Sequence, residues 1–271
     1  MTANLLSIAG LDPSGGAGVL ADVKTFSALG TYGTAVLTAV TAQNTRGVTA
    51  VSQLAPALVT AQLETLFADV RIDAVKIGML GSAAVVRAVA DALRRHRLPH
   101  VVLDPVMVAK SGDRLLSEDA VQALRDDLLP LCDLVTPNLP EAADLLGEPE
   151  ARDEAGMRDQ LERLTGLAPG VLLKGGHLDG DESVDLLAVD GGRSRFPAPR
   201  VRTRNTHGTG CTLSSAIAAL RPASADWPAA VAAAKAYVTE AIAASDQLDV
   251  GSGHGPLHHF VRLWEPADLR R

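Results

Sequence analysis

A glycine-rich stretch, NTHGTGC at residues 205–211, contains the residues best placed to do chemistry. It runs into TLSSAIAAL, whose small apolar residues are typical of a buried helix, so the helix is predicted over 208–220. The first backbone N–H groups of a helix have no partner within it and carry partial positive charge, so they bind anions. We therefore expect Gly208, Thr209, Gly210 and Cys211 to form an anion site.

Cys211 would add a thiol to this anion site. At a helix N-terminus the pKa of a thiol falls below about 8.5, which favours the reactive thiolate. Such a thiolate could attack a substrate or accept a proton from one. The residues alone also allow a simpler interpretation, in which an inert, buried cysteine follows a glycine-rich helix start.

Oxygen-bearing side chains follow two further apolar runs. Asp104 comes directly after HVVL, and Asn138 and Glu141 stand three residues apart in TPNLPEA. Oxygen ligands of this kind suit Mg²⁺, which keeps several waters and is usually shared with phosphates. Each residue alone could be a helix cap or a surface acid, but their positions after successive strands favour a site for metal and phosphate.

Lysine and amide side chains complete the polar candidates. Lys174 ends the run GVLLK beside two glycines, where a surface lysine is the alternative interpretation. Gln43 and Asn44 follow a run rich in β-branched residues, and a side-chain amide offers the donor and acceptor that a heteroaromatic ring edge needs. The glycines of GLDPSGGAG, residues 10–18, allow a sharp turn close to a ligand or simply a tight strand-to-helix connection.

The hydrophobic pattern indicates which elements position these side chains. Short apolar runs alternate with amphipathic stretches of helical period. Strands are predicted at 5–10, 34–43, 73–79, 100–106, 132–138 and 170–176, and helices at 18–30, 56–70, 82–96, 117–129, 139–146 and 153–166. This alternation predicts an α/β fold with a doubly wound, mostly parallel sheet and helices on both faces. Ligands bind at the carboxyl ends of such strands, which is where the candidates lie.

The last third of the chain departs from this alternation. SVDLLAVDGGRSRFPAP, residues 183–199, predicts a hairpin with a Gly-Gly turn, and a final helix is expected at about 229–245. Pro56 should occupy the first turn of its helix, and Ser82 should be an N-cap. No linker divides the chain, so a single domain over residues 1–271 is expected.

The composition argues against several classes of protein. Hydrophobic residues make up 47% of the chain and supply a large core, while aromatics make up only 3%. A net charge of −7 without a basic run argues against nucleic-acid binding. Two distant cysteines do not make a disulfide framework, and neither a signal peptide nor an apolar run of about 18 residues is visible. We expect a soluble, cytoplasmic protein with no membrane partner.

Taken together, these segments resemble one known family, the hydroxymethylpyrimidine/phosphomethylpyrimidine kinases of thiamine biosynthesis, within the ribokinase-like superfamily. The resemblance runs from residue 7 to residue 259, and its segments are SIAGLDPSGGAGVLADVKTFSALGTYG, TAVTAQNTRGV, VKIGML, VLDPVMVAKSGDRLL, DLVTPNLPEA, LLKGGH, NTHGTGCTLSSAIAA and GHGPLHH. It implies a ribokinase-like fold, usually a homodimer, that uses ATP and Mg²⁺ to phosphorylate 4-amino-5-hydroxymethyl-2-methylpyrimidine twice, giving the monophosphate and then the diphosphate. Leu11 departs from the family, which more often has a small polar residue there.

The resemblance also implies roles for individual residues. Around the pyrimidine it places Gly10, Asp22, Gln43, Met79 and Val106, with Gln43 bonding the amino-nitrogen edge. Asp104 and Glu141 would hold the metal directly or through water, and Asn138 and Lys174 would lie along the ATP phosphates. Gly208, Thr209, Gly210 and Cys211 would form the anion hole. Cys211 would lie nearest the reacting hydroxyl, and as a base it would serve the first transfer more than the second, whose acceptor is already an ionised phosphate.

Three alternatives stay open from the sequence. A pyridoxal kinase of the same superfamily would take a similar ring, although Ala109 stands where the pyridoxal relatives most like this family tend to have cysteine. A cysteine hydrolase would pair Cys211 with His207, and a non-catalytic sensor would keep only the fold. The stretch AKSGDRLL, residues 109–116, is a candidate mobile loop. The histidines of GHGPLHH, His254 and His258 among them, are given no catalytic role.

Overall fold

A single nine-stranded sheet organises the chain in the computed structural model, which describes residues 1–107 and 116–264. The strands, in the spatial order β3-β2-β1-β4-β5-β6-β7-β8-β9, are β3 (Gly47–Gln53), β2 (Tyr32–Asn44), β1 (Asn4–Leu11), β4 (Ala74–Ile77), β5 (Val101–Leu103), β6 (Leu134–Val135), β7 (Gly170–Lys174), β8 (Glu182–Val189) and β9 (Gly192–Pro199). In this spatial order, β2, β1, β4, β5, β6 and β7 pair in parallel with their neighbours. Antiparallel strands border this centre on both sides, β3 beside β2, and β8 and β9 beyond β7. The predicted mostly parallel sheet is confirmed.

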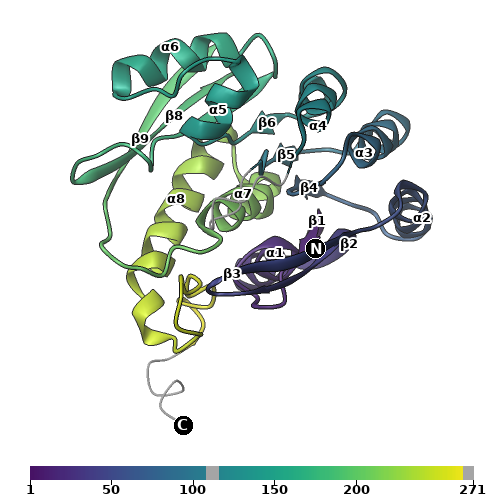
Figure 1. Cartoon of the computed structure of the whole chain (residues 1–271), viewed down its shortest axis with the longest axis horizontal. Coiled ribbons are helices and arrows are strands. Elements are labelled where there is room, and N and C mark those ends of the chain that lie inside the picture. The colour runs from purple at the N-terminus through teal and green to yellow at the C-terminus, as the bar shows by residue number, and fades with distance from the viewer. Residues whose placement is uncertain (108–115, 265–271) are drawn as a thin grey trace.

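Helices cover both faces of the sheet, as predicted (Figure 1). Their bounds are α1 (Gly18–Ala28), α2 (Pro56–Phe67), α3 (Ala83–His96), α4 (Glu118–Ala123), α5 (Leu139–Leu146), α6 (Glu154–Leu164), α7 (Thr209–Leu220) and α8 (Trp227–Ala243). Helices α2 to α6 contribute to one hydrophobic cluster, and α1, α7 and α8 contribute to a second cluster on the opposite face. Strands β1 and β4 to β8 therefore have a core on both sides, which explains their near-continuous apolar runs.

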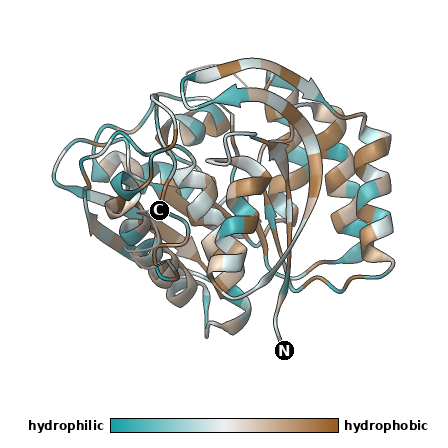
Figure 2. Ribbon diagram, turned by 90° about the horizontal axis from the view of Figure 1, so that it is seen from below, coloured by the Kyte–Doolittle hydropathy of each residue, from teal (hydrophilic) through white to brown (hydrophobic). Residues whose placement is uncertain are grey.

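Local sequence signals fix several helix ends. Pro56 is the first residue of α2, and the Ser82 hydroxyl accepts a hydrogen bond from Val85 N at the start of α3. Both features were predicted. Figure 2 shows hydrophobic and hydrophilic residues interleaved along the helices, as expected where one side packs on the sheet. No helix in the described ranges is both long and apolar enough to cross a bilayer.

Some predicted elements differ in detail. The β8–β9 hairpin exists, but its two-residue turn is Asp190-Gly191, with φ of 50° and 75°, and Gly192 already pairs with Val189. The prediction of a Gly-Gly turn was therefore wrong by one residue, because an Asp-Gly pair suits a turn with two positive φ angles. Strand β3 was not predicted, since it is an exposed, antiparallel strand without a hydrophobic run. The helix predicted at 117–129 ends in a wider π-helical turn over Leu124–Leu128.

Candidate active site

A cavity of about 680 Å³ opens where the carboxyl ends of the central strands meet the N-terminus of α7. Its walls include all the residues that the sequence assigned to the site except Asp22, namely Gly10, Gln43, Met79, Asp104, Val106, Asn138, Glu141, Lys174, Gly208, Thr209, Gly210 and Cys211. Leu11, the departure from the family pattern, also lines it. The edge of the sheet predicted to hold the site is thus the one that holds the cavity.

The start of α7 depends on its glycines. Gly208 has φ of 78° as the N-cap residue, and a Cβ there would overlap the backbone carbonyl of Gly16. Only glycine brings this loop so close to the first glycine-rich turn. At Gly210, a Cβ would lie 3.0 Å from Lys174 Nζ, so glycine also leaves room for that ammonium at the helix end. The helix start, with its partial positive charge, faces the cavity together with a cation.

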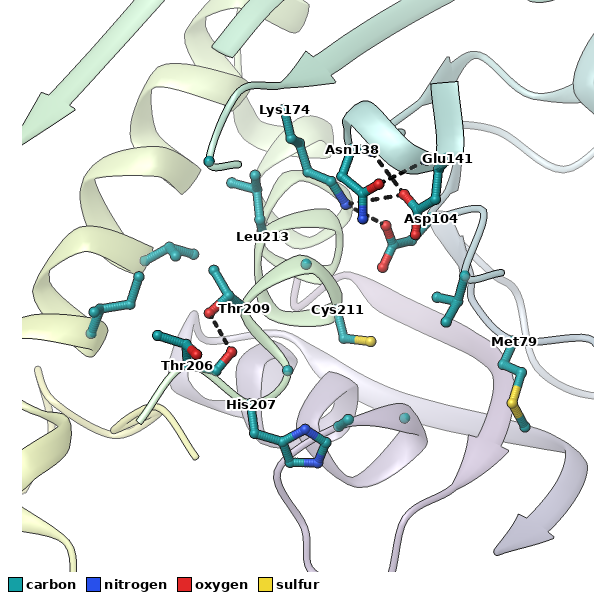
Figure 3. Close-up of a pocket in the computed structure, with 18 of the residues that line it drawn as sticks. Met79, Asp104, Asn138, Glu141, Lys174, Thr206, His207, Thr209, Cys211 and Leu213 are labelled. Carbon is teal, nitrogen blue, oxygen red and sulfur yellow. Dashed lines mark hydrogen bonds and ion pairs between the residues drawn. The ribbon is translucent and has the colours of Figure 1, made fainter. Parts of the chain in front are cut away.

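Lys174 and two carboxylates form a charged cluster beside the helix start (Figure 3). Lys174 Nζ lies 2.7 Å from Asp104 Oδ1 and 4.0 Å from Glu141 Oε2. Burial alone would lower the pKa of Lys174, but the Asp104 and Glu141 carboxylates outweigh it and raise this pKa to about 12. Burial raises the pKa of Glu141 to about 7, although the Lys174 ammonium opposes the change. The lysine therefore stays charged inside the cavity wall.

Asn138 and Glu141 are also the capping box of α5. The Asn138 side chain accepts from Glu141 N at 2.9 Å, and Glu141 Oε2 accepts from Asn138 N at 2.8 Å. The sequence left open whether these residues were a cap or part of a site. In the structure the two residues are both a cap and part of the site, because the capping box fixes their side chains in the wall of the cavity.

The carboxylates suit a shared cation better than a closed metal site. The described part of the chain contains no group of three or more His, Cys, Asp or Glu residues that could hold a metal ion. Asp104 and Glu141 supply two carboxylates next to the helix start. One or two carboxylates completed by phosphate oxygens and water is the usual environment of Mg²⁺, so the donor set fits that ion only together with a phosphorylated ligand.

Cys211 lies in the first turn of α7 and lines the cavity, but its protonation differs from the expectation. Burial raises the pKa of the Cys211 thiol to about 11, against the opposing effects of the Lys76 ammonium and the Gly18 N–H. The prediction of a lowered pKa is therefore wrong, because the loss of solvent outweighs the positive helix end. Near neutral pH the side chain is a neutral thiol.

Asp22 lies outside the cavity wall, in a buried network with Lys76. Lys76 Nζ donates to both carboxylate oxygens of Asp22 at 2.9 Å, and Asp22 also accepts from the Ser7 and Ser215 hydroxyls at 2.6 and 2.7 Å. The position of Asp22 therefore does not support direct contact with a ring. Lys76, which lines the cavity, was missed. Its signal was a lysine within the apolar strand DAVKIGM, since a buried lysine requires a partner.

A second pair, Asp12 and His207, was also missed. His207 Nε2 lies 2.7 Å from Asp12 Oδ2 and 3.4 Å from the amide nitrogen of Gln43. Burial opposes ionisation of Asp12, but hydrogen bonds from His207 and Ser14 lower its pKa overall. The pair joins the turn after β1 to the loop before α7, so the His207 imidazole is already paired with the Asp12 carboxylate. Together with the protonated Cys211 thiol, this removes the two features that a cysteine hydrolase needs.

The cavity extends on both sides of Cys211 (Figure 3). Met79 lies on one side of Cys211 and Leu213 on the other. Val106 and the Gln43 amide, whose Oε1 accepts from the Thr41 hydroxyl at 3.1 Å, line the same cavity. The residues that α8 contributes to the wall mix the apolar Val238 and Ile242 with the polar Lys235 and Thr239. Two ligands could therefore meet at the helix start. Ala109 and most of the candidate loop 109–116 lie outside the described residues.

Comparison with known proteins agrees with this geometry. The family model described as phosphomethylpyrimidine kinase matches residues 12–258. The chain belongs to the phosphomethylpyrimidine kinase family. It is 56% identical over 262 residues to the hydroxymethylpyrimidine/phosphomethylpyrimidine kinase of Escherichia coli, covering 96% of this chain and 98% of that protein.

Solved structures of relatives share the ribokinase-like fold. A pyridoxal kinase of Bacillus subtilis in complex with ADP superposes with a TM-score of 0.89 at 34% identity, covering 97% of this chain and 100% of that one. A phosphomethylpyrimidine kinase of Clostridium difficile gives a TM-score of 0.79 at 41% identity, covering 89% and 100%. Family membership thus rests on sequence, while the fold is common to both kinds of kinase.

Proposed function

We propose that this protein phosphorylates 4-amino-5-hydroxymethyl-2-methylpyrimidine with ATP, and then phosphorylates the monophosphate to the diphosphate, in thiamine biosynthesis. The observation that carries the proposal is the helix start of α7, which lines one cavity together with the Gln43 amide and the cluster of Asp104, Glu141 and Lys174. Phosphoryl transfer needs two ligands held in line and charge stabilisation between them, and it needs little covalent help from the protein. Identity of 56% to a kinase named for both substrates supports this acceptor.

The pyrimidine would occupy the end that carries Gln43, Gly10, Met79 and Val106. The Thr41 hydroxyl donates to Gln43 Oε1, and the Gln43 NH₂ group, 3.4 Å from His207 Nε2, has a second hydrogen that would donate to a ring nitrogen. A Cβ at Gly10 would lie 2.5 Å from the Met79 methyl group, so glycine leaves space for the methionine beside the ring. The acceptor hydroxyl would then point toward Cys211 and the start of α7.

ATP would enter from the side of Leu213 and α8, with its phosphates along Asn138 and Lys174. Mg²⁺, when bound with ATP, would neutralise phosphate charge, and Asp104 and Glu141 are the residues that would hold it. Lys174 bonds Asp104 in the free protein and would share its charge with the phosphates. The N–H groups from Gly208 to Cys211 would stabilise the charge that develops on the transferring group.

Cys211 acts in this proposal as a neutral group that contacts the reacting oxygen. A thiol with a pKa of about 11 is a weak base near neutral pH, so it would orient the acceptor rather than remove its proton. The earlier expectation that the first transfer depends on a thiolate is therefore replaced.

A pyridoxal kinase is the second candidate, because pyridoxal kinases are among the structural relatives with the higher TM-scores. Both activities require the same fold, so the acceptor must be tested directly. ATP consumption should be measured with the pyrimidine alcohol, its monophosphate and pyridoxal, each at equal concentration. Turnover of the alcohol and the monophosphate above that of pyridoxal is the expected result, and the opposite order would contradict the proposal.

The remaining expectations are proposals of the same kind. We propose a cytoplasmic homodimer in which residues 1–271 form one catalytic unit, without a nucleic-acid or membrane partner. The near-complete coverage of the Escherichia coli kinase supports one unit of this size. Sedimentation of the purified protein would test the dimer.

A further inference from the structure

The stretch GSGHGPLHH near the C-terminus, residues 251–259, contacts parts of the chain that are far apart in sequence. We propose that this stretch, here called the C-terminal clasp, is a positioning element that sets the spacing between the ring-binding end of β2 and the anion hole at α7. The inference rests on the proposed function for its consequence, and on contacts of described residues for its geometry.

The first part of the clasp holds the turn after β2. Gly253 N donates to Thr45 Oγ1 at 3.1 Å, and His254 N donates to Thr45 O at 2.8 Å. A Cβ at Gly251 would overlap the Thr45 hydroxyl, and a Cβ at Gly253 would overlap its carbonyl oxygen. Thr45 stands two residues after Gln43, so the clasp contacts the strand end that bears the proposed ring-recognition amide. In Figure 1 this yellow segment lies beside the β2–β3 hairpin.

The middle of the clasp holds the loop before the anion hole. His207 N donates to Gly255 O at 3.1 Å, and His207 pairs with Pro256 in a parallel bridge. A Cβ at Gly255 would overlap Asn205 Oδ1. Because Gly208 follows His207 directly, the clasp fixes the residue from which the anion hole begins.

The last part of the clasp fastens it to α7 and α8. The Thr212 hydroxyl lies 3.2 Å from His259 Nε2, and the Tyr237 hydroxyl donates to His259 O at 2.6 Å. His258 N donates to Ala241 O at 3.0 Å. One stretch of nine residues therefore connects the turn after β2, the anion-hole loop and both helices that follow.

The glycines allow the clasp to come this close to its neighbours. Gly251, Gly253 and Gly255 lie in a bent, irregular stretch, and Gly251 has a φ of 67°. A Cβ at Gly253 would meet the Thr45 backbone, whereas a Cβ at Gly251 or Gly255 would meet the side chain of Thr45 or Asn205. Side chains at these positions would therefore push the clasp away from both segments.

Positioning of this kind matters most for the acceptor. A displacement of about 1 Å between reacting groups can cost about 10²-fold in rate. The clasp touches the ring end and the anion hole, but its contacts do not include Lys174 or Asn138 at the proposed phosphate-binding wall. Loosening it should therefore impair use of the pyrimidine while ATP affinity stays the same.

Gly253→Ala tests the clasp, because its Cβ would meet Thr45 backbone that no side-chain rotation can move. Gly47→Ala is the matched control in the β2–β3 hairpin that the clasp contacts, because a Cβ at Gly47 would meet no described atom within 4 Å. We expect Gly253→Ala to lower kcat/KM for the pyrimidine alcohol about 10- to 100-fold. The affinity for ATP, measured by titration calorimetry, should match that of Gly47→Ala and the unaltered protein.

Hydrogen–deuterium exchange provides a readout that needs no activity. In Gly253→Ala, backbone exchange should rise both in residues 42–48 and in residues 205–213, although the atoms nearest to the added Cβ all belong to the first of these segments. If exchange rises in 42–48 alone, or if kcat/KM is unchanged, the clasp does not couple the two segments and the proposal is wrong. An unaltered protein that lacks kinase activity would instead contradict the proposed function, and the exchange result would still decide the clasp.

A rescue experiment separates positioning from general damage. Gly255→Ala should impair the alcohol reaction, because its Cβ meets the side chain of Asn205. Asn205→Ala removes that obstacle at the cost of one hydrogen bond to Asp246, of 2.7 Å. The double variant should recover most of the activity of Asn205→Ala alone, and strictly additive losses would overturn the steric basis of the proposal.

Discussion

Lys174 Nζ lies 2.7 Å from Asp104 Oδ1, although the two residues end different strands and are 70 positions apart. Glu141 Oε2 is 4.0 Å from the same nitrogen, so one ammonium stands between two carboxylates. This cluster lies beside the first turn of α7. A polyphosphate at this position would meet both the N-terminus of α7 and the Lys174 ammonium, which the two carboxylates already hold in place.

Replacing Lys174 with methionine should impair the kinase severely. It removes the cation proposed to lie along the phosphates, and loss of one such group typically costs about 10²- to 10³-fold in kcat. Steady-state kinetics with ATP and the pyrimidine alcohol measures the effect. Binding of the pyrimidine in the absence of ATP is the control and should not change, because the ring end lies on the other side of Cys211 (Figure 3). A variant with normal kcat would exclude Lys174 from the transfer.

Much of the fold was predictable because its signals are local. Apolar runs separated by amphipathic stretches gave the parallel centre, and Pro56 and Ser82 gave two helix starts. Strand β3 was not predictable from such signals, since its mostly exposed residues form no hydrophobic pattern and depend on the partner β2. The one-residue error at the hairpin arose because three consecutive residues, Asp190 to Gly192, all suit a turn.

The site was predictable as a set of positions and less so as chemistry. Asp104, Lys174 and the glycines follow predicted strands or begin a helix, so their meeting at one edge followed from the topology. The protonation of Cys211 did not follow, because it depends on how deeply neighbouring elements bury the thiol. Asp22 and Lys76 are partners 54 positions apart, and no local pattern reveals such a pair.

Cys211→Ala should slow both phosphoryl transfers by a similar factor. Because burial raises the pKa of the thiol to about 11, the side chain is neutral near pH 7 and is not the base for either step. Single-turnover rates for the alcohol and for the monophosphate give the comparison. Alkylation of the unaltered protein across pH is an independent check, since its rate should still be rising above pH 9. A much larger loss in the first transfer would restore the thiolate interpretation.

His259, in the C-terminal clasp, should make stability depend on pH. Burial, with smaller effects from Lys24, His258 and His207, lowers its pKa to about 3. An unfolded histidine binds a proton below about pH 6.5, so between pH 6.5 and 3 the unfolded state binds more protons and stability falls as pH falls. The free energy of unfolding in urea should therefore drop more between pH 7.5 and 5 for the unaltered protein than for His259→Gln. Equal drops would show that His259 is not the group responsible.

Removing the charge of Lys76 or Asp22 alone should lower the stability of the fold far more than removing both charges together. Lys76→Met leaves the Asp22 carboxylate without its cation in a completely buried position, and breaking such a pair typically costs about 3–5 kcal/mol. The double variant Lys76→Met with Asp22→Asn removes both charges, and the asparagine oxygen can still accept from Ser7 or Ser215. Urea unfolding of the two single variants and the double variant measures the coupling. Because the Lys76 ammonium lowers the pKa of Cys211 more than the Asp22 carboxylate raises it, thiol alkylation in the double variant should require a higher pH than in the unaltered protein. Additive losses of stability would mean that the two charges do not depend on each other.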